Sequence, residues 1–142
     1  MNLGKGLRPG LLTAAVILIL DQVSKWVILI EVMDPPRVIP LTPFFNLVLG
    51  WNRGISFGML DGDSNLNLWL LPLLALAIIV ALVVWLARTD GGLVALALGL
   101  IIGGAAGNVV DRLLHGAVLD FLDFHAAGWH WTAFNVADAG IT

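Results

Sequence analysis

Acidic residues set among apolar side chains are the first candidates for chemistry in this chain. Asp120 lies in the run Val118–Phe124, and Asp138 follows Phe134–Ala137. Two close aspartates can share one proton, because both cannot ionise cheaply side by side. The ionised carboxylate of such a pair takes a proton from water, and the protonated one polarises a carbonyl. The sequence therefore offers Asp120 and Asp138 as a hydrolytic pair.

Simpler interpretations of the acidic residues stay open beside this one. Asp138 is equally expected as a cap or first-turn acid near the positive end of a helix dipole. Asp123, in the same apolar run as Asp120, is interpreted as a solvated loop acid.

Other hydrolytic chemistries find little support among the residue types present. The chain has no cysteine, which excludes a thiol nucleophile and cysteine-based metal sites. None of its serines lies in a recognisable nucleophile turn. The three histidines, His115, His125 and His130, lack the spacing of a zinc hydrolase, so we interpret them as loop histidines and expect no metal site.

Two further groups of polar residues lie inside apolar segments. Asp21 and Lys25 are four residues apart and share a helix face, either as an internal ion pair or as support for a polar site. Asn108, Asp111 and Arg112 also fall on one helix face, and Arg112 is expected to hold Asp111 or another carboxylate. The glycines before Asn108 allow a neighbouring helix to approach closely.

A glycine-containing turn offers hydrogen-bond donors. The sequence from Asn52 through Gly54 to Gly58 carries amide and guanidinium groups that could hold a peptide carbonyl or a phosphate.

Composition indicates which solvent surrounds these residues. Of 142 residues, 59% are hydrophobic and 12% are charged, whereas soluble domains carry about 45–50% apolar and about 25% charged residues. An integral membrane protein with a single domain, residues 1–142, is the expected class. The net charge of −3 and the scattered Lys and Arg residues leave nucleic acid without a binding surface.

Three segments are long enough to cross a bilayer, which takes about 20 mostly apolar residues. They lie at about 11–33, 68–87 and 93–114, and a fourth apolar stretch starts at 134–142. A cleavable signal peptide at the N-terminus is disfavoured, because no small-residue cleavage site follows the first apolar run. Prolines, glycines and short apolar runs predict a lobe of strands and turns at about 34–67.

The basic residues near the span ends predict the orientation. Lys5, Arg8 and Arg88 lie on one side and Arg37 and Arg53 on the other. The first side is therefore expected in the cytoplasm and the lobe outside.

Two functions without hydrolysis remain as alternatives. Intramembrane Asp, Lys and Arg also mark proton or ion relays, so the chain could be a small transporter or channel subunit. The gathering of polar residues toward one membrane face, with none in the second span, speaks against a conduction path. A scaffold that binds through its lobe is the third possibility.

Five blocks, taken together, resemble lipoprotein signal peptidase, also called signal peptidase II. They are Asp21–Lys25, Asn52–Gly58, Gly103–Arg112, Val118–Phe121 and Phe134–Asp138, in the family's order and covering almost the whole chain.

The resemblance implies an aspartic endopeptidase of the bacterial cytoplasmic (inner) membrane. Such an enzyme removes the signal peptide from diacylglyceryl-modified prolipoproteins, cutting before the lipidated cysteine at the outer, periplasmic face. Membrane lipid surrounds it, the cyclic peptide globomycin inhibits it, and no cofactor is implied. By motif match, Asp120 and Asp138 are its catalytic pair. The matching supporting positions are Asp21, Lys25, Asn52, Gly54, Asn108, Asp111, Arg112 and Asn135.

The family fold implied by the resemblance is all-α, with a four-helix transmembrane bundle, a small extracytoplasmic β-lobe and cytoplasmic termini. The fourth helix is expected to be truncated after Thr142.

Overall fold

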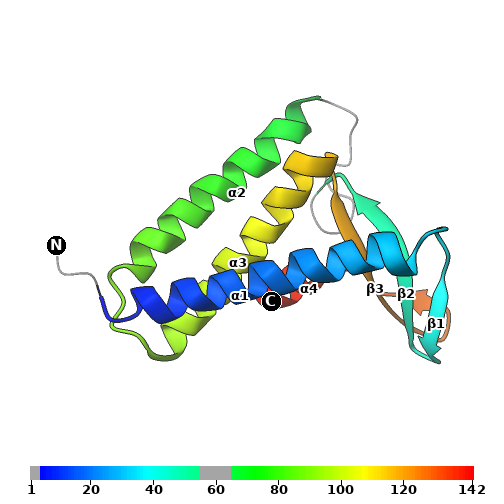
Figure 1. The fold of residues 1–142 in the computed structure, drawn as a ribbon, viewed down its shortest axis with the longest axis horizontal. Helices are drawn as coiled ribbons and strands as arrows, with labels where there is room; N and C mark the ends of the chain where they lie inside the picture. The colour runs from blue at the N-terminus through cyan, green and yellow to red at the C-terminus, as the bar shows by residue number, and fades with distance from the viewer. Residues whose placement is uncertain (1–3, 55–64) are drawn as a thin grey trace.

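The computed structural model describes residues 4–54 and 65–142, and most of them are helical (Figure 1). The sequence-predicted turn residues 55–58 lie outside the described residues. The elements run in the order α1 (Leu7–Val27), a π-helical turn η1 (Ile28–Val32), β1 (Ile39–Thr42), β2 (Phe45–Asn52), α2 (Asn65–Leu86), α3 (Gly92–His115), β3 (Val118–Ala126), β4 (Trp129–His130) and α4 (Val136–Ile141).

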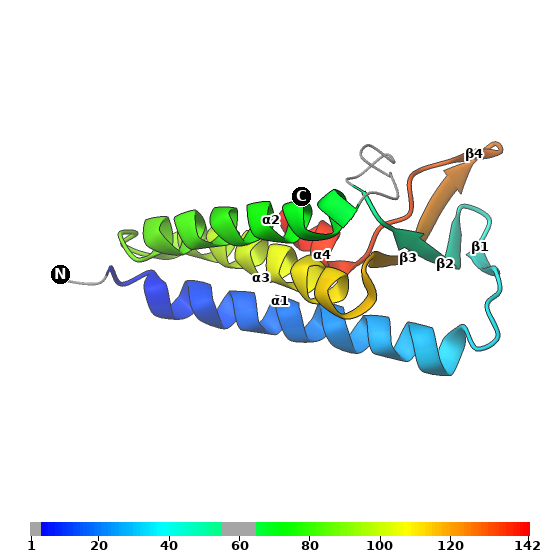
Figure 2. The ribbon, with the colours of Figure 1, turned by 90° about the horizontal axis from the view of Figure 1, so that it is seen from above.

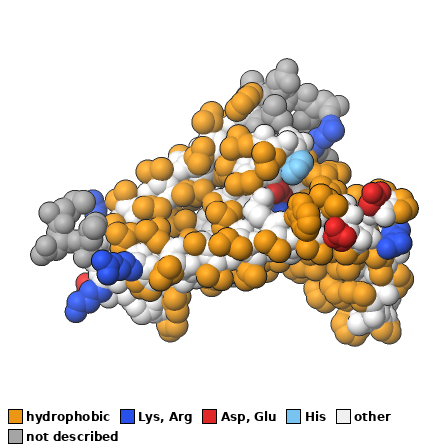
Figure 3. Space-filling model, viewed as in Figure 1, with side chains coloured by type: hydrophobic (Ala, Val, Ile, Leu, Met, Phe, Trp, Pro, Cys, Tyr) orange, Lys and Arg blue, Asp and Glu red, His pale blue; other side chains and the backbone are white. Residues whose placement is uncertain are grey.

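Three of the described helical segments are long and apolar enough to cross a membrane, as the sequence predicts. They are Leu7–Val32, Trp69–Leu86 and Gly92–His115, with mean hydropathies of 1.8, 2.8 and 2.2. Apolar side chains cover much of their outer surface, while Lys and Arg gather toward the ends of the molecule (Figure 3). An apolar surface of this kind requires lipid rather than water around it. The chain is therefore an integral membrane protein.

Helix α3 is the central helix, since it packs against α1, α2 and α4 (Figures 1 and 2). Its glycines allow the backbones to approach closely. A Cβ at Gly99 would collide with the carbonyl oxygen of Gly10, and one at Gly103 would collide with that of Ala14. Small residues serve this purpose between membrane helices, where no hydrophobic effect draws the helices together.

A four-stranded antiparallel sheet lies at one end of the helices, in the order β1-β2-β3-β4 (Figure 2). Asn52 pairs with Val118 and Gly50 with Asp120, and the β2–β3 register shifts between Leu47 and Gly50. The sequence pattern predicts strands only within 34–67. The structure adds β3 and β4, which the chain supplies only after α3.

Helix α4 is short and begins with a capping box. The Asn135 side chain accepts from the backbone N–H of Asp138, and the Asp138 side chain accepts from the backbone N–H of Asn135. Reciprocal caps of this kind satisfy two donors that a helix start leaves unpaired. The helix therefore fixes Asp138 relative to Asn135.

Candidate active site

Asp120 and Asp138 line one cavity of about 470 Å³. Strand β3 carries Asp120 and the first turn of α4 carries Asp138, while Asn52 from β2 and the extended residues Trp131–Phe134 complete much of the wall. The cavity volume falls within the range of about 300–1,000 Å³ typical of ligand sites. The two aspartates of the sequence hypothesis thus meet at a space that can admit a substrate.

Amide donors hold the Asp120 carboxyl. Asn135 Nδ2 donates to Oδ1 at 2.8 Å, and Asn52 Nδ2 donates to Oδ2 at 3.2 Å. Burial and the neighbouring charge of Asp138 together raise the pKa of Asp120 to about 6, against the lowering effect of the two amides and of the Lys25 charge. A carboxyl poised near neutral pH can both hold and release a proton.

Asp138 is held from two sides. Asn108 Nδ2 donates to Oδ1 at 2.8 Å, and the backbone N–H of Asn135 donates to Oδ2 at 3.3 Å. The interpretation of Asp138 as a capping acid in the first turn of a helix is therefore confirmed. The same side chain also lines the cavity beside Asp120.

Asn135 connects the two carboxyls and is completely buried. Its Nδ2 donates to Asp120, and its Oδ1 accepts from the backbone N–H of Asp138 at 2.9 Å. This side chain therefore links β3 to α4, next to the backbone hydrogen bonds between Phe134 and Leu122.

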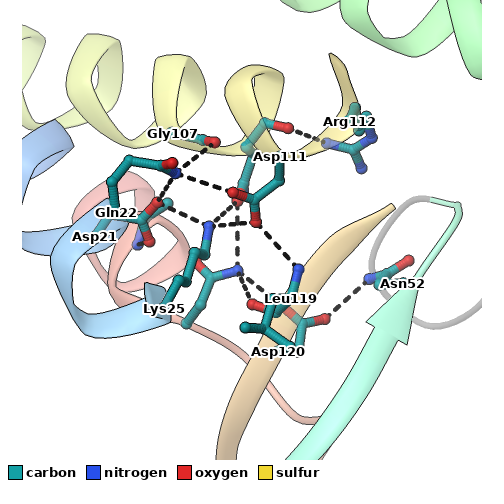
Figure 4. Close-up of polar contacts among 12 residues, drawn as sticks. Asp21, Gln22, Lys25, Asn52, Gly107, Asp111, Arg112, Leu119 and Asp120 are labelled. Carbon is teal, nitrogen blue, oxygen red and sulfur yellow. Dashed lines mark hydrogen bonds and ion pairs between the residues drawn. The ribbon is translucent and has the colours of Figure 1, made fainter. Parts of the chain in front are cut away.

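A second polar network lies behind the cavity, between α1 and α3 (Figure 4). Lys25 Nζ lies 2.7 Å from Asp21 Oδ2 and 2.8 Å from Asp111 Oδ2. All three side chains are buried. The predicted Asp21–Lys25 ion pair is present, but it extends across to the neighbouring helix.

This network reaches the segments that carry the two cavity aspartates. Asp21 Oδ1 accepts from the backbone N–H of Ala137 at 2.8 Å, next to Asp138 in the chain. Asp111 Oδ2 accepts from the backbone N–H of Leu119 at 3.1 Å, next to Asp120. The buried ions therefore anchor β3 and α4 to the same pair of transmembrane helices.

Arg112 was expected to pair with Asp111 or another carboxylate, but among the described residues it forms no ion pair. Among the described residues Asp111 pairs with Lys25, whereas Arg112 Nη2 donates to the carbonyl oxygen of Gly54 at 2.8 Å. The Gly54 backbone N–H donates in turn to Asn52 Oδ1 at 3.0 Å. Arg112 thus supports Asn52 and, through it, Asp120, because its long side chain passes Asp111 and reaches the end of β2.

Gln22 is a site residue absent from the sequence prediction. Its Nε2 lies 2.9 Å from Asp111 Oδ1 and 3.2 Å from both Asp21 Oδ2 and the Gly107 carbonyl oxygen. Gly107 is needed here for space, since a Cβ would collide with the Asp21 carboxylate. The only sequence feature that pointed to Gln22 was its position next to Asp21. An amide next to an acid is too common to predict a site residue.

The interpretation of Asp123 as a solvated acid is also wrong. Its side chain is buried and accepts from Asn46 Nδ2 at 2.9 Å, and His130 Nδ1 lies 2.9 Å from Oδ2. Burial raises its pKa, but hydrogen bonds from His130 and Asn46 outweigh this and lower the pKa overall. Asp123 does not line the cavity that Asp120 and Asp138 share. Within residues 4–54 and 65–142, no cluster of three or more His, Cys, Asp or Glu could hold a metal ion.

These features define a class: an integral membrane protein with two neighbouring aspartates at a cavity beside its helical bundle. The family model described as signal peptidase (SPase) II matches residues 13–142. The chain is 50% identical over 139 residues to a lipoprotein signal peptidase of Methylobacterium sp. (strain 4-46), covering 95% of this chain and 84% of that protein. It is 45% identical over 140 residues to the lipoprotein signal peptidase of Ralstonia nicotianae, covering 97% and 80%. The chain belongs to the signal peptidase II family.

Solved structures agree with this assignment. One bacterial membrane enzyme superposes with a TM-score of 0.84 at 28% identity, covering 99% of this chain and 85% of the other. A second gives 0.81 at 26% identity, covering 99% and 90%. The sequence resemblance is confirmed, the chain is a membrane peptidase, and the transporter alternative is not favoured.

Proposed function

We propose that this protein is an aspartic endopeptidase that removes the signal peptide from diacylglyceryl-modified prolipoproteins, cutting before the lipidated cysteine. The observation that carries this proposal is the pair Asp120 and Asp138 on one cavity, each fixed by asparagine donors. The relatives' printed name, lipoprotein signal peptidase, supplies the substrate class.

The reaction needs one ionised and one protonated carboxyl. We assign the proton to Asp120, whose pKa is about 6, and the ionised role to Asp138. Asp138 accepts a proton from water as the water oxygen attacks the scissile carbonyl carbon. Asp120 donates its proton to the carbonyl oxygen, which gives a neutral tetrahedral diol.

Collapse of that intermediate completes the cycle. The proton on Asp138 passes to the departing amine as the C–N bond breaks, and a hydroxyl proton of the diol returns to Asp120. The products are a carboxylic acid and an amine, and the pair regains its starting protonation. No step requires a metal or an organic cofactor.

The remaining site residues act by holding this pair. Asp21, Lys25 and Asp111 anchor the segments beside both aspartates. Asn108 and Asn135 aim their amides at Asp138 and Asp120, and Arg112 with Gly54 orients Asn52. Supports with locked geometry keep reacting atoms within a fraction of an ångström.

The basic residues near the helix ends support a location in the inner membrane with the cavity at its outer face. Backbone hydrogen bonds from Gly4 to Ala87 and from Gly6 to Thr89 hold the basic N-terminal segment against the α2–α3 turn. Lys5, Arg8 and Arg88 belong to these segments, at the end of the bundle away from the sheet (Figure 1). By the positive-inside rule that end faces the cytoplasm of a bacterial inner membrane, so the cavity lies at the outer, periplasmic face.

A cavity at the outer face of the membrane suits a substrate that is anchored in the membrane by lipid. A prolipoprotein can enter the cavity sideways from the membrane, with its diacylglyceryl group left in lipid. A cyclic peptide of the globomycin type would bind the same cavity and block it.

A cleavage assay tests the proposal. The protein in detergent is incubated with a diacylated prolipoprotein, and release of the signal peptide is followed by gel shift. Asp120→Asn and Asp138→Asn should each abolish cleavage. The matched control is Asp123→Asn, a buried aspartate of the same strand outside the cavity, which should keep activity. Normal cleavage by either cavity variant would reject the catalytic pair.

A further inference from the structure

A second, smaller hollow lies on the sheet, next to the catalytic cavity. It has a volume of about 220 Å³ and is lined by Phe44, Phe124, His125, Ala126, Trp129 and Trp131. Three of its aromatic side chains are strongly exposed, Trp129 at 73%, Trp131 at 58% and Phe44 at 57%. Exposed aromatics around a concavity are typical of binding sites. The term aromatic pocket is used for these six residues below.

The aromatic pocket neighbours the catalytic cavity, because Trp131 lines both. From Trp131 the wall of the catalytic cavity continues through Thr132 and Ala133 toward Phe134. A ligand that extends beyond the catalytic cavity along this wall therefore arrives at the aromatic rings.

The wall between the two spaces presents free backbone groups. The N–H groups of Trp131 and Phe134 bond back to β3, at the carbonyls of Phe124 and Leu122. Between these anchors, Thr132 and Ala133 make no backbone hydrogen bond within the part of the chain that the structure describes. An extended peptide binds to unpaired backbone of this kind by adding a strand, with side chains in pockets alongside.

The lining of the aromatic pocket is mostly apolar, with four Phe and Trp side chains and one alanine beside His125. His125 Nε2 has no hydrogen-bond partner among the described residues, but it is buried and has almost no accessible surface toward the pocket. The matching occupant therefore presents apolar surface to the rings, as one side chain of a peptide does.

Size and placement limit the occupant further. A volume of about 220 Å³ lies below the range of about 300–1,000 Å³ for pockets that hold whole ligands, and suits one side chain. The β3–β4 turn that carries Trp129 lies at the outer tip of the sheet, away from the helices (Figure 2). That turn has positive φ at both Ala127 (51°) and Gly128 (82°), as a tight two-residue hairpin requires, which sets Trp129 opposite Ala126.

We propose that the aromatic pocket is a substrate subsite that binds an apolar side chain of the mature polypeptide, a few residues beyond the lipidated cysteine. The inference rests on the proposed function. The signal peptide of a prolipoprotein stays with the membrane, so the mature chain is the part that leads outward over the sheet. The pocket adds a preference for mature sequence to the recognition of the lipidated cysteine.

Competition between matched substrates tests this subsite. Diacylated prolipoproteins are prepared with Leu, Gly or Asp at each of the second to fourth positions of the mature chain. At one of these positions the wild-type protein should cleave the Leu substrate about tenfold faster, in kcat/KM, than the Gly substrate, as expected for burial of one apolar side chain. Trp129→Ala should remove this preference and leave cleavage of the Gly substrate unchanged.

The control is Trp85→Ala, which changes another strongly exposed tryptophan (58%) at the far end of α2 and should keep the Leu preference. A preference that survives Trp129→Ala and Phe44→Ala would overturn the subsite. So would an equal loss on all substrates, because the aromatics would then act as membrane anchors. Failure of the wild-type protein to cleave any substrate would instead reject the proposed peptidase function.

Discussion

Replacing Asn135 by alanine should both destabilise the protein and change the pH dependence of cleavage. Asn135 donates to Asp120 at 2.8 Å and accepts from the backbone N–H of Asp138 at 2.9 Å, and it is fully buried. Alanine removes both contacts and has no side-chain group that could form a new hydrogen bond. The two losses affect different measurable quantities, so they can be separated.

The magnitudes follow from the two contacts. Loss of an N-cap side chain costs about 0.5–2 kcal/mol, and leaving a buried hydrogen-bond acceptor such as the Asp120 carboxyl unsatisfied costs about 1–3 kcal/mol. We expect the free energy of unfolding to fall by about 2–4 kcal/mol. The displaced pair should lower kcat by about 100-fold, as misplacement of reacting groups by an ångström does.

The pH effect has a definite sign. The amide of Asn135 favours the ionised form of Asp120 and so lowers its pKa against burial. Without it the pKa of Asp120 rises from about 6. The lost amide hydrogen bond is expected to favour the ionised form by about 1.4 kcal/mol, which corresponds to one pKa unit. We therefore expect the pKa to rise by about one unit. The active, singly protonated pair is lost as pH rises through this pKa. The alkaline limb of the kcat/KM profile should therefore move to higher pH by about one unit.

Two further variants separate the roles of Asn135. Asn135→Ser keeps an N-cap oxygen but not the reach to Asp120, so it should recover part of the stability and keep the shifted limb. Asn46→Ala is the matched control, since Asn46 is a buried asparagine that donates to Asp123 at 2.9 Å, away from the cavity. It should lower stability without moving the pH profile. An unshifted limb in Asn135→Ala, with reduced stability, would mean that Asn135 only caps α4.

Three other substitutions test the supporting structure. Lys25→Met leaves Asp21 and Asp111 buried without their cation and should reduce stability by about 3–5 kcal/mol in thermal unfolding in detergent; the exposed Lys5→Met should change it by less than about 0.5 kcal/mol. Gly107→Ala forces the Asp21 carboxylate to move and should cost about 1–3 kcal/mol, with most cleavage lost; unchanged melting would contradict the close contact. His130→Ala removes a partner that lowers the pKa of Asp123. That depressed pKa contributes stability at pH above 3.8 that is lost as pH falls through it, so acid unfolding, followed by tryptophan fluorescence, should begin at higher pH in the variant.

The transmembrane helices were predictable because each is encoded locally. A run of about 20 apolar residues is enough to indicate a span, and the three runs became the three long helices of the structure. The i, i+4 spacing of Asp21 and Lys25 likewise predicted their contact. The π-helical turn at Ile28–Val32 left no comparable signal, since a change of helical period over five residues does not alter the apolar pattern.

The sheet was only half predicted because its pairing is nonlocal. Val118–Ala126 was interpreted as acids among apolar side chains, yet it forms β3 beside β2, with two long helices between them in the chain. The solvated interpretation of Asp123 failed for the same reason, since Asn46, its partner, lies 77 positions away. Arg112 was misassigned because a flexible side chain can pass its neighbour in sequence and reach a carbonyl 58 positions away.

Three asparagines donate to the two cavity aspartates, and each has its amide orientation fixed by a donor that cannot accept. Lys25 Nζ donates to Asn108 Oδ1 at 3.3 Å, so the Asn108 NH₂ must face Asp138. The backbone N–H of Gly54 fixes the oxygen of Asn52 in the same way, which turns its NH₂ toward Asp120.

Asn135 follows the same rule, with the Asp138 backbone N–H on its oxygen and Asp120 on its nitrogen. No cation forms an ion pair with either cavity aspartate among the described residues. Direct contact with Lys25 would hold one carboxylate ionised and remove the shared proton. Neutral amides transmit the position of the buried ions without a direct ion pair. Burial and the charge of Asp138 then outweigh the lowering effect of the Lys25 charge on the Asp120 pKa, so a proton can still be held on the pair.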